Sequence, residues 1–135
     1  MNILVIDAQG GGLGRQIVSA IKKTFPASSV TAVGTNSAAT TAMKKAGADH
    51  AATGENAVIV CSRRADVIVG PIGIAIADSM YGEVTPAMAA AIGQSDAKRL
   101  LIPMSQCDNI ILGTASLTIA SAIDSILEYL RSWGA

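Results

Sequence analysis

The sequence has few of the residue types on which nucleic-acid binding depends. Only 3% of its 135 residues are aromatic, which leaves few rings to stack on the bases of a single strand. Charged residues make up 15%, against about 25% in a typical soluble domain. The formal net charge is zero, so the chain has no basic footprint for a phosphate backbone. We therefore expect no nucleic-acid partner.

Cysteine, histidine and long apolar runs are also scarce. The two cysteines, Cys61 and Cys107, fit reduced thiols better than a disulfide framework. No cluster of His, Cys and Asp has the spacing of a metal site, so no bound metal is expected. Gly, Pro, Asp or Arg interrupts every apolar run before it reaches the roughly 20 residues that span a bilayer. Without a basic leader before the first strand, a cytoplasmic protein with no membrane partner is expected.

Apolar side chains are abundant, at 50% of the residues. A chain of this length is expected to form one domain, residues 1–135, that buries a core without disulfides. The excess of apolar over charged residues is larger than such a domain needs to bury alone. We therefore expect a homo-oligomer, with a dimer as the simplest closed assembly. Candidate interfaces are the alanine-rich stretch 87–91 and a C-terminal helix that carries Tyr129 and Trp133.

Apolar stretches typical of strands alternate with amphipathic stretches typical of helices. The predicted strands are residues 2–7, 30–34, 48–52, 66–70, 99–102 and 109–112. The predicted helices are residues 15–25, 38–46, 53–64, 85–92 and 117–133. The last two strands are too close in sequence for a parallel crossover, so the last is expected to be antiparallel or outside the sheet. This order predicts an α/β fold: a three-layer, Rossmann-like, mainly parallel open sheet with helices on both faces.

The most informative motif is the run Gln9-Gly10-Gly11-Gly12-Leu13-Gly14-Arg15. It follows the first predicted strand and opens the first predicted helix, where α/β proteins offer backbone N–H groups to a phosphate. Gly11 to Gly14 can present consecutive N–H donors, and the Arg15 guanidinium can donate charged hydrogen bonds to a phosphate. We predict an anion or nucleotide site here. The alternative is a tight strand-to-helix turn in which the glycines serve packing only.

The loop does not match a standard nucleotide fingerprint. Gly10 and Gly12 fit the pattern G-x-G-x-x-G, but Arg15 stands where the third glycine belongs. Gly12 and Gly14 fit G-x-x-x-G-x-G, with Ala8 in the first place. A P-loop is excluded because the Gly-Lys-Ser/Thr ending is missing. The expected ligand is therefore a nucleotide or another phosphorylated small molecule, and the sequence names no specific cofactor.

Two further loops follow predicted strands at the same edge of the sheet. The first, residues 34–37, stands where an NAD site has an acidic residue for the ribose and where NADP sites favour arginine. It has neither, which disfavours an ordinary NAD site; its polar side chains either bind a ligand or cap the next helix. The second loop is residues 70–73. Ligands of parallel sheets bind at the carboxyl ends of the strands, so the predicted ligand-binding residues are Gln9, Gly10, Gly11, Gly12, Leu13, Gly14, Arg15, Gly34, Thr35, Asn36, Ser37, Gly70, Pro71, Ile72 and Gly73.

Candidate catalytic side chains are sparse, and no catalytic residue is assigned. His50, the only histidine, lies beside Asp49, and Asp78 and Cys107 follow predicted strands. One alternative function is a small enzyme that uses His50, Asp78 or Cys107 as acid, base or nucleophile in the same pocket. Another is an oligomeric structural or interaction module without a ligand.

Several stretches of the chain carry a resemblance to a known family. They are residues 9–14, 32–37, 46–50, 53–57, 70–74, 85–89 and 93–98, and together they span nearly the whole chain. On these stretches the chain resembles a bacterial family of small Rossmann-like proteins with a QGGGxG loop, catalogued as a domain of unknown function. The resemblance implies no assigned reaction. Glycine is expected in the family where this chain has Ala8.

Overall fold

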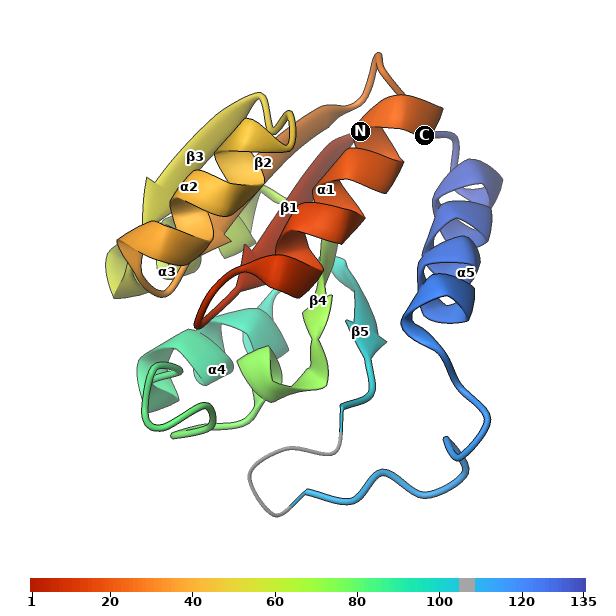
Figure 1. The fold of residues 1–135 in the computed structure, drawn as a ribbon. Coiled ribbons are helices and arrows are strands. Elements are labelled where there is room, and N and C mark those ends of the chain that lie inside the picture. The colour runs from red at the N-terminus through yellow and green to blue at the C-terminus, as the bar shows by residue number, and fades with distance from the viewer. Residues whose placement is uncertain (105–108) are drawn as a thin grey trace.

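A single parallel sheet forms the centre of the computed structural model, which describes residues 1–104 and 109–135 (Figure 1). Its strands are β1 (Asn2–Asp7), β2 (Ser29–Gly34), β3 (His50–Thr53), β4 (Val67–Pro71) and β5 (Lys98–Ile102). They lie in the order β3-β2-β1-β4-β5, and every neighbouring pair is parallel. This arrangement confirms the predicted α/β, Rossmann-like fold.

The helices cover both faces of the sheet. They are α1 (Gly12–Thr24), α2 (Ser37–Lys45), α3 (Glu55–Arg64), a 3₁₀ helix η1 (Ile72–Ala75), α4 (Pro86–Gln94) and α5 (Ile119–Ser132). From β1 the chain winds outward to β3, then returns past β1 to β4 and β5. Because parallel crossovers are right-handed, this reversal puts α1 and α2 on one face and α3 and α4 on the other. The helix α5 packs beside α1 (Figure 1).

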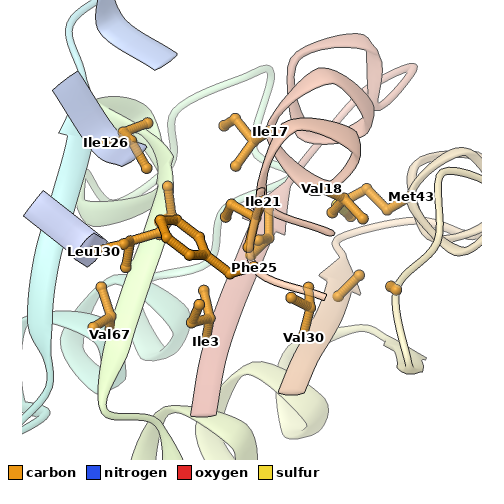
Figure 2. Packing of buried hydrophobic residues seen from close by; sticks show 14 of the residues in the cluster. Ile3, Ile17, Val18, Ile21, Phe25, Val30, Met43, Val67, Ile126 and Leu130 are labelled. Atoms are coloured by element: carbon orange, nitrogen blue, oxygen red, sulfur yellow. The ribbon is translucent and has the colours of Figure 1, made fainter. Parts of the chain in front are cut away.

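The central strand β1 divides the core into two layers because its side chains alternate between the faces. Ile3 and Val5 belong to the cluster that α1, α2 and α5 complete, which includes Phe25 and Leu130 (Figure 2). Leu4 and Ile6 belong to the second cluster, under α3 and α4. All four of these β1 side chains are at most 1% exposed. An uninterrupted apolar run of this kind is typical of a parallel strand buried on both faces.

The predicted strand at residues 109–112 is wrong. These residues form no strand, and Ile110 and Leu112 are 79% and 89% exposed. The segment instead enters a turn, in which the Thr114 hydroxyl donates to the carbonyl of Ile111 and Gly113 has a φ of +84°. An apolar, β-branched run predicts a strand only where a neighbouring strand is available to pair with it. Here β5 remains the last strand of the sheet.

Candidate functional site

The three predicted loops lie at the same edge of the sheet, because they follow the carboxyl ends of the adjacent strands β2, β1 and β4. The winding direction reverses between β1 and β4, and this is the position where open α/β sheets bind ligands. The first two loops also contact each other directly. The Thr35 amide donates to the carbonyl of Asp7 at 3.0 Å, and the Asn36 side-chain amide donates to the carbonyl of Gln9 at 2.9 Å.

Part of the glycine loop is helical, which the sequence did not predict. The helix α1 begins at Gly12 instead of Arg15, so the loop includes its first turn. Two of the expected donors are already used: the Gly11 amide donates to the carbonyl of Ala8 at 3.1 Å, and the Gly14 amide donates to Asp7 Oδ2 at 2.6 Å. The expectation of consecutive free donors from Gly11 to Gly14 is therefore wrong. Within the loop at residues 9–15, which the structure describes in full, the amides without a partner are those of Gly10, Gly12 and Leu13.

A buried carboxylate, Asp7 at the end of β1, holds this turn together. Its side chain is 5% exposed and accepts hydrogen bonds from the amides of Ala8, at 2.8 Å, and Gly14. Burial raises the pKa of Asp7 above its ordinary value; the two amide hydrogen bonds oppose this shift, and the nearby charge of Glu83 adds to it. Asp7 thus caps a helix whose own N-cap residue is a glycine without a side chain.

Packing explains most of the loop glycines. A Cβ atom on Gly11, whose φ is +73°, would lie 2.8 Å from the Ala39 Cα, and one on Gly14 would lie 2.6 Å from the Met43 sulfur. In the other two loops, Cβ atoms would meet protein atoms at 2.7 Å or less at Gly34, Gly70 and Gly73. Gly10 and Gly12 differ, because both are exposed and no atom lies within 4 Å of a Cβ built there.

Sequence reasoning missed Glu83, which lies where the first two loops meet. Its Oε1 accepts from the Gln9 amide at 2.8 Å, the Thr35 hydroxyl at 2.8 Å and the Asn36 side-chain amide at 2.7 Å. Burial alone would raise the pKa of Glu83, but the hydrogen bonds outweigh it and hold the pKa below its ordinary value. No local signal marks this residue, because its partners are 47 to 74 positions away in the chain.

Several other predicted site residues line two separate hollows. Arg15 and Ser37 line an open groove of about 500 Å³ between α1 and α2, together with Lys45. Asn36 caps α2, since its Oδ1 accepts from the Ala39 amide at 2.9 Å. In the third loop, residues 71–73 line a different cavity of only about 10 Å³.

The candidate catalytic residues do not gather around the glycine loop. His50 begins β3, at the end opposite the three loops, and lines a groove of about 440 Å³ that includes Cys61. Its neighbour Asp49 instead pairs with Lys22, at 2.9 Å. Burial raises the pKa of the Cys61 thiol, which favours its unreactive protonated form. Asp78 is exposed beyond η1, and Cys107 lies outside the described residues.

Residues 1–104 and 109–135 contain neither a metal-binding cluster of side chains nor a membrane-spanning helix. No group of three or more His, Cys, Asp or Glu side chains there is placed to hold a metal ion. No helix in the same residues combines the length and apolar character that crossing a membrane requires.

A family model described as "Domain of unknown function (DUF3842)" matches residues 2–133. The chain belongs to this family. The match confirms the resemblance seen in the sequence, and DUF3842 carries no activity in its description. No curated protein matches the chain.

Among solved structures, the chain is similar to a dodecameric FMN-dependent Ubix-like decarboxylase from Escherichia coli O157:H7. The two share 18% sequence identity with a TM-score of 0.49, over 97% of this chain and 76% of the other. The fold of this DUF3842 member is assigned from its own strand order.

Proposed function

We propose that the loop at residues 9–15 binds the phosphate group of a nucleotide or another phosphorylated small molecule. The observation that carries this proposal is the contrast among the glycines. Gly11 and Gly14 are needed for packing, whereas Gly10 and Gly12 border open space at the start of α1. Glycines that no internal contact requires are expected where a ligand approaches the backbone.

Hydrogen-bond donors and charge at this position support an anionic ligand. The free amides of Gly12 and Leu13 lie in the first turn of α1, at the positive end of the helix dipole. The Arg15 guanidinium has no partner among the described residues and lines the adjacent groove with Lys45. In this proposal, residues 34–37 and 70–73 flank the ligand at the same edge of the sheet.

Replacing Gly12 with valine tests the proposal. The new side chain would project into the open space and block the anion while leaving protein contacts intact. At a ligand concentration 100-fold above Kd, the wild type should gain about 2.7 kcal/mol, or roughly 8 °C in Tm. G12V should lose most of that gain and keep a similar Tm without ligand. G93V is the matched control, because Gly93 is also an exposed helical glycine with no atom within 4 Å of its Cβ.

The measurement is thermal unfolding with inorganic phosphate, nucleotides and sugar phosphates. Equal ligand-induced shifts in G12V and the wild type would remove the loop from the site. A wild type that no phosphorylated compound stabilises would contradict the proposal, and the glycines would then serve the turn alone.

We also propose that the chain forms a homodimer. Large apolar side chains are exposed in the segment before α5 and on α5 itself: Ile110, Leu112, Leu117, Ile119 and Tyr129. Beside them, β5 and α5 border an open groove of about 410 Å³. Exposed apolar surface of this kind commonly marks a protein interface.

A further inference from the structure

The Glu83 carboxylate lies at the carboxyl end of β2, although the residues that follow β2 in the sequence include no acidic residue. The residues directly after β2 are Thr35, Asn36 and Ser37, none of which carries a charge. The structure nevertheless brings a carboxylate to this position, because the Glu83 Oε1 accepts from both Thr35 and Asn36. The same oxygen accepts from the Gln9 amide, so Glu83 lies between the glycine loop and the end of β2.

A compact turn presents this side chain. The Asp78 amide donates to the carbonyl of Val84 at 2.7 Å, and the Val84 amide donates to the carbonyl of Ser79 at 3.3 Å. The turn is anchored by Met80 and Val84, which are 6% and 1% exposed. Asp78, Met80 and Tyr81 all have positive φ values, between 56° and 64°. Non-glycine residues rarely adopt this conformation, and clusters of them are typical of functional segments.

The hydrogen bonds leave one oxygen of Glu83 available. All of its described partners donate to Oε1, so Oε2 has none among residues 1–104 and 109–135. The side chain is partly exposed, and the donors to Oε1 hold its pKa below the ordinary value, which keeps the group ionised at neutral pH. A carboxylate in this state only accepts hydrogen bonds. Its negative charge also repels any phosphate group placed next to Oε2.

We propose that Oε2 of Glu83 accepts hydrogen bonds from the ribose hydroxyls of a nucleotide bound at the glycine loop. This inference rests on the proposed function and narrows its ligand to nucleotides with a free 2′,3′-diol. In dinucleotide-binding sheets, an acidic residue at the end of the second strand binds these hydroxyls. Here a residue from the turn before α4 supplies the carboxylate at that position.

The test compares ribonucleotides with their dideoxy counterparts by calorimetry. The probes are the four ribonucleoside 5′-monophosphates, the matching 2′,3′-dideoxy compounds and inorganic phosphate. The wild type should bind the best ribonucleotide about 10- to 100-fold more tightly than its dideoxy form, as expected for hydrogen bonds to a charged group. E83Q should reduce that preference to about threefold or less. Inorganic phosphate should bind E83Q as tightly as the wild type or slightly more tightly, because a negative charge near the glycine loop is removed.

The chemistry of E83Q makes this expectation specific. The donors from Gln9, Thr35 and Asn36 hold the side-chain oxygen in place, so the new NH₂ group takes the position of Oε2. A donor then faces the ribose in place of an acceptor. T35V, which removes one donor to Oε1 and leaves the carboxylate, should weaken the preference only partly. E128Q, a change on the exposed surface of α5, should behave as the wild type.

Three outcomes would overturn the role of Glu83 while leaving phosphate binding intact. The first is an undiminished ribose preference in E83Q, and the second is a wild type that binds both nucleotide forms equally. The third is a gain of more than about tenfold in the affinity of E83Q for inorganic phosphate, because a gain of that size would mean that the carboxylate occupies the anion's own place. If the wild type binds none of the probes, including phosphate, the proposed function fails together with this inference.

Discussion

Close contacts at single residues decide which glycines this protein requires. Gly14 lies where α1 passes over the end of β1, so that its amide reaches Asp7 Oδ2 and its Cα faces the Met43 sulfur. Gly12, two residues earlier, faces open space. The same loop therefore contains a glycine that the fold needs and a glycine that it does not need. The spacing of glycines in the sequence does not distinguish these two roles.

Replacing Gly14 with alanine should lower the free energy of unfolding by about 1–3 kcal/mol, because the new Cβ overpacks the turn. Its nearest atoms would be Met43 Sδ at 2.6 Å and Asp7 Cβ at 2.8 Å. G12A is the matched control and should stabilise the protein by up to about 1 kcal/mol, because alanine restricts the unfolded chain. Urea unfolding measures both. Equal effects of the two variants would show that Gly14 has room for a side chain.

At the scale of elements, one lysine connects the ends of α1, β2 and β3. Lys22 Nζ donates to the carbonyls of Pro26, at 3.1 Å, and Ser28, at 2.9 Å, and pairs with Asp49. Asp49 in turn accepts from the Val30 amide at 2.8 Å, and this bond and the one from Lys22 hold the pKa of Asp49 below its ordinary 3.8. This junction sets where the edge strand begins.

The lowered pKa of Asp49 predicts a pH-dependent contribution to stability. It is complete above the ordinary pKa and is lost as the pH falls through the lower pKa of the folded state. At neutral pH, D49N should lower the free energy of unfolding by about 1 kcal/mol or less, because Asp49 is exposed and its partner Lys22 is partly exposed. The difference from the wild type should shrink below about pH 4.

Urea unfolding between pH 3 and 7 checks this expectation. D124N, an exposed change on α5, serves as the control and should follow the wild type at every pH. A D49N deficit of constant size across the range would mean that the asparagine disturbs packing and that the charge of Asp49 contributes nothing.

At the scale of the whole molecule, most of the exposed large apolar side chains of the described residues lie in the segment after β5 and on α5. Ile110 and Leu112 belong to the segment that was expected to form a sixth strand, and they are 79% and 89% exposed. The helix α5 follows directly and adds Tyr129, which is 54% exposed. A second copy of the chain that covers this surface would remove the apolar excess seen in the composition.

Sedimentation at micromolar concentration should therefore show a dimer. L112E should shift it to monomer, because a buried carboxylate without a partner is costly at an interface, while Tm at high dilution stays within about 2 °C of the wild type. A51E, an exposed change on β3 at the opposite edge of the sheet, is the matched control for added charge and should remain a dimer. A wild type that sediments as a monomer would contradict the dimer, and a dimeric L112E would place the interface elsewhere.

The sequence by itself determined the strands β1 to β5, the helices α1 to α5 and their order, because those depend on local patterns. The apolar run of β1, the proline at the start of α4 and the glycine loop after β1 all identify their elements without any distant partner. The parallel α/β fold follows from the alternation of strands and helices.

Only the tertiary structure decided what depends on contacts between distant residues. It separated the packed Gly14 from the open Gly12, and it left residues 109–112 outside the sheet, where no strand is paired with them. It also brought Glu83 to Thr35, across 48 positions of sequence. Local periodicity does not predict such pairs. Two residues far apart in the sequence come into contact only after the strands between them have taken their order in the sheet.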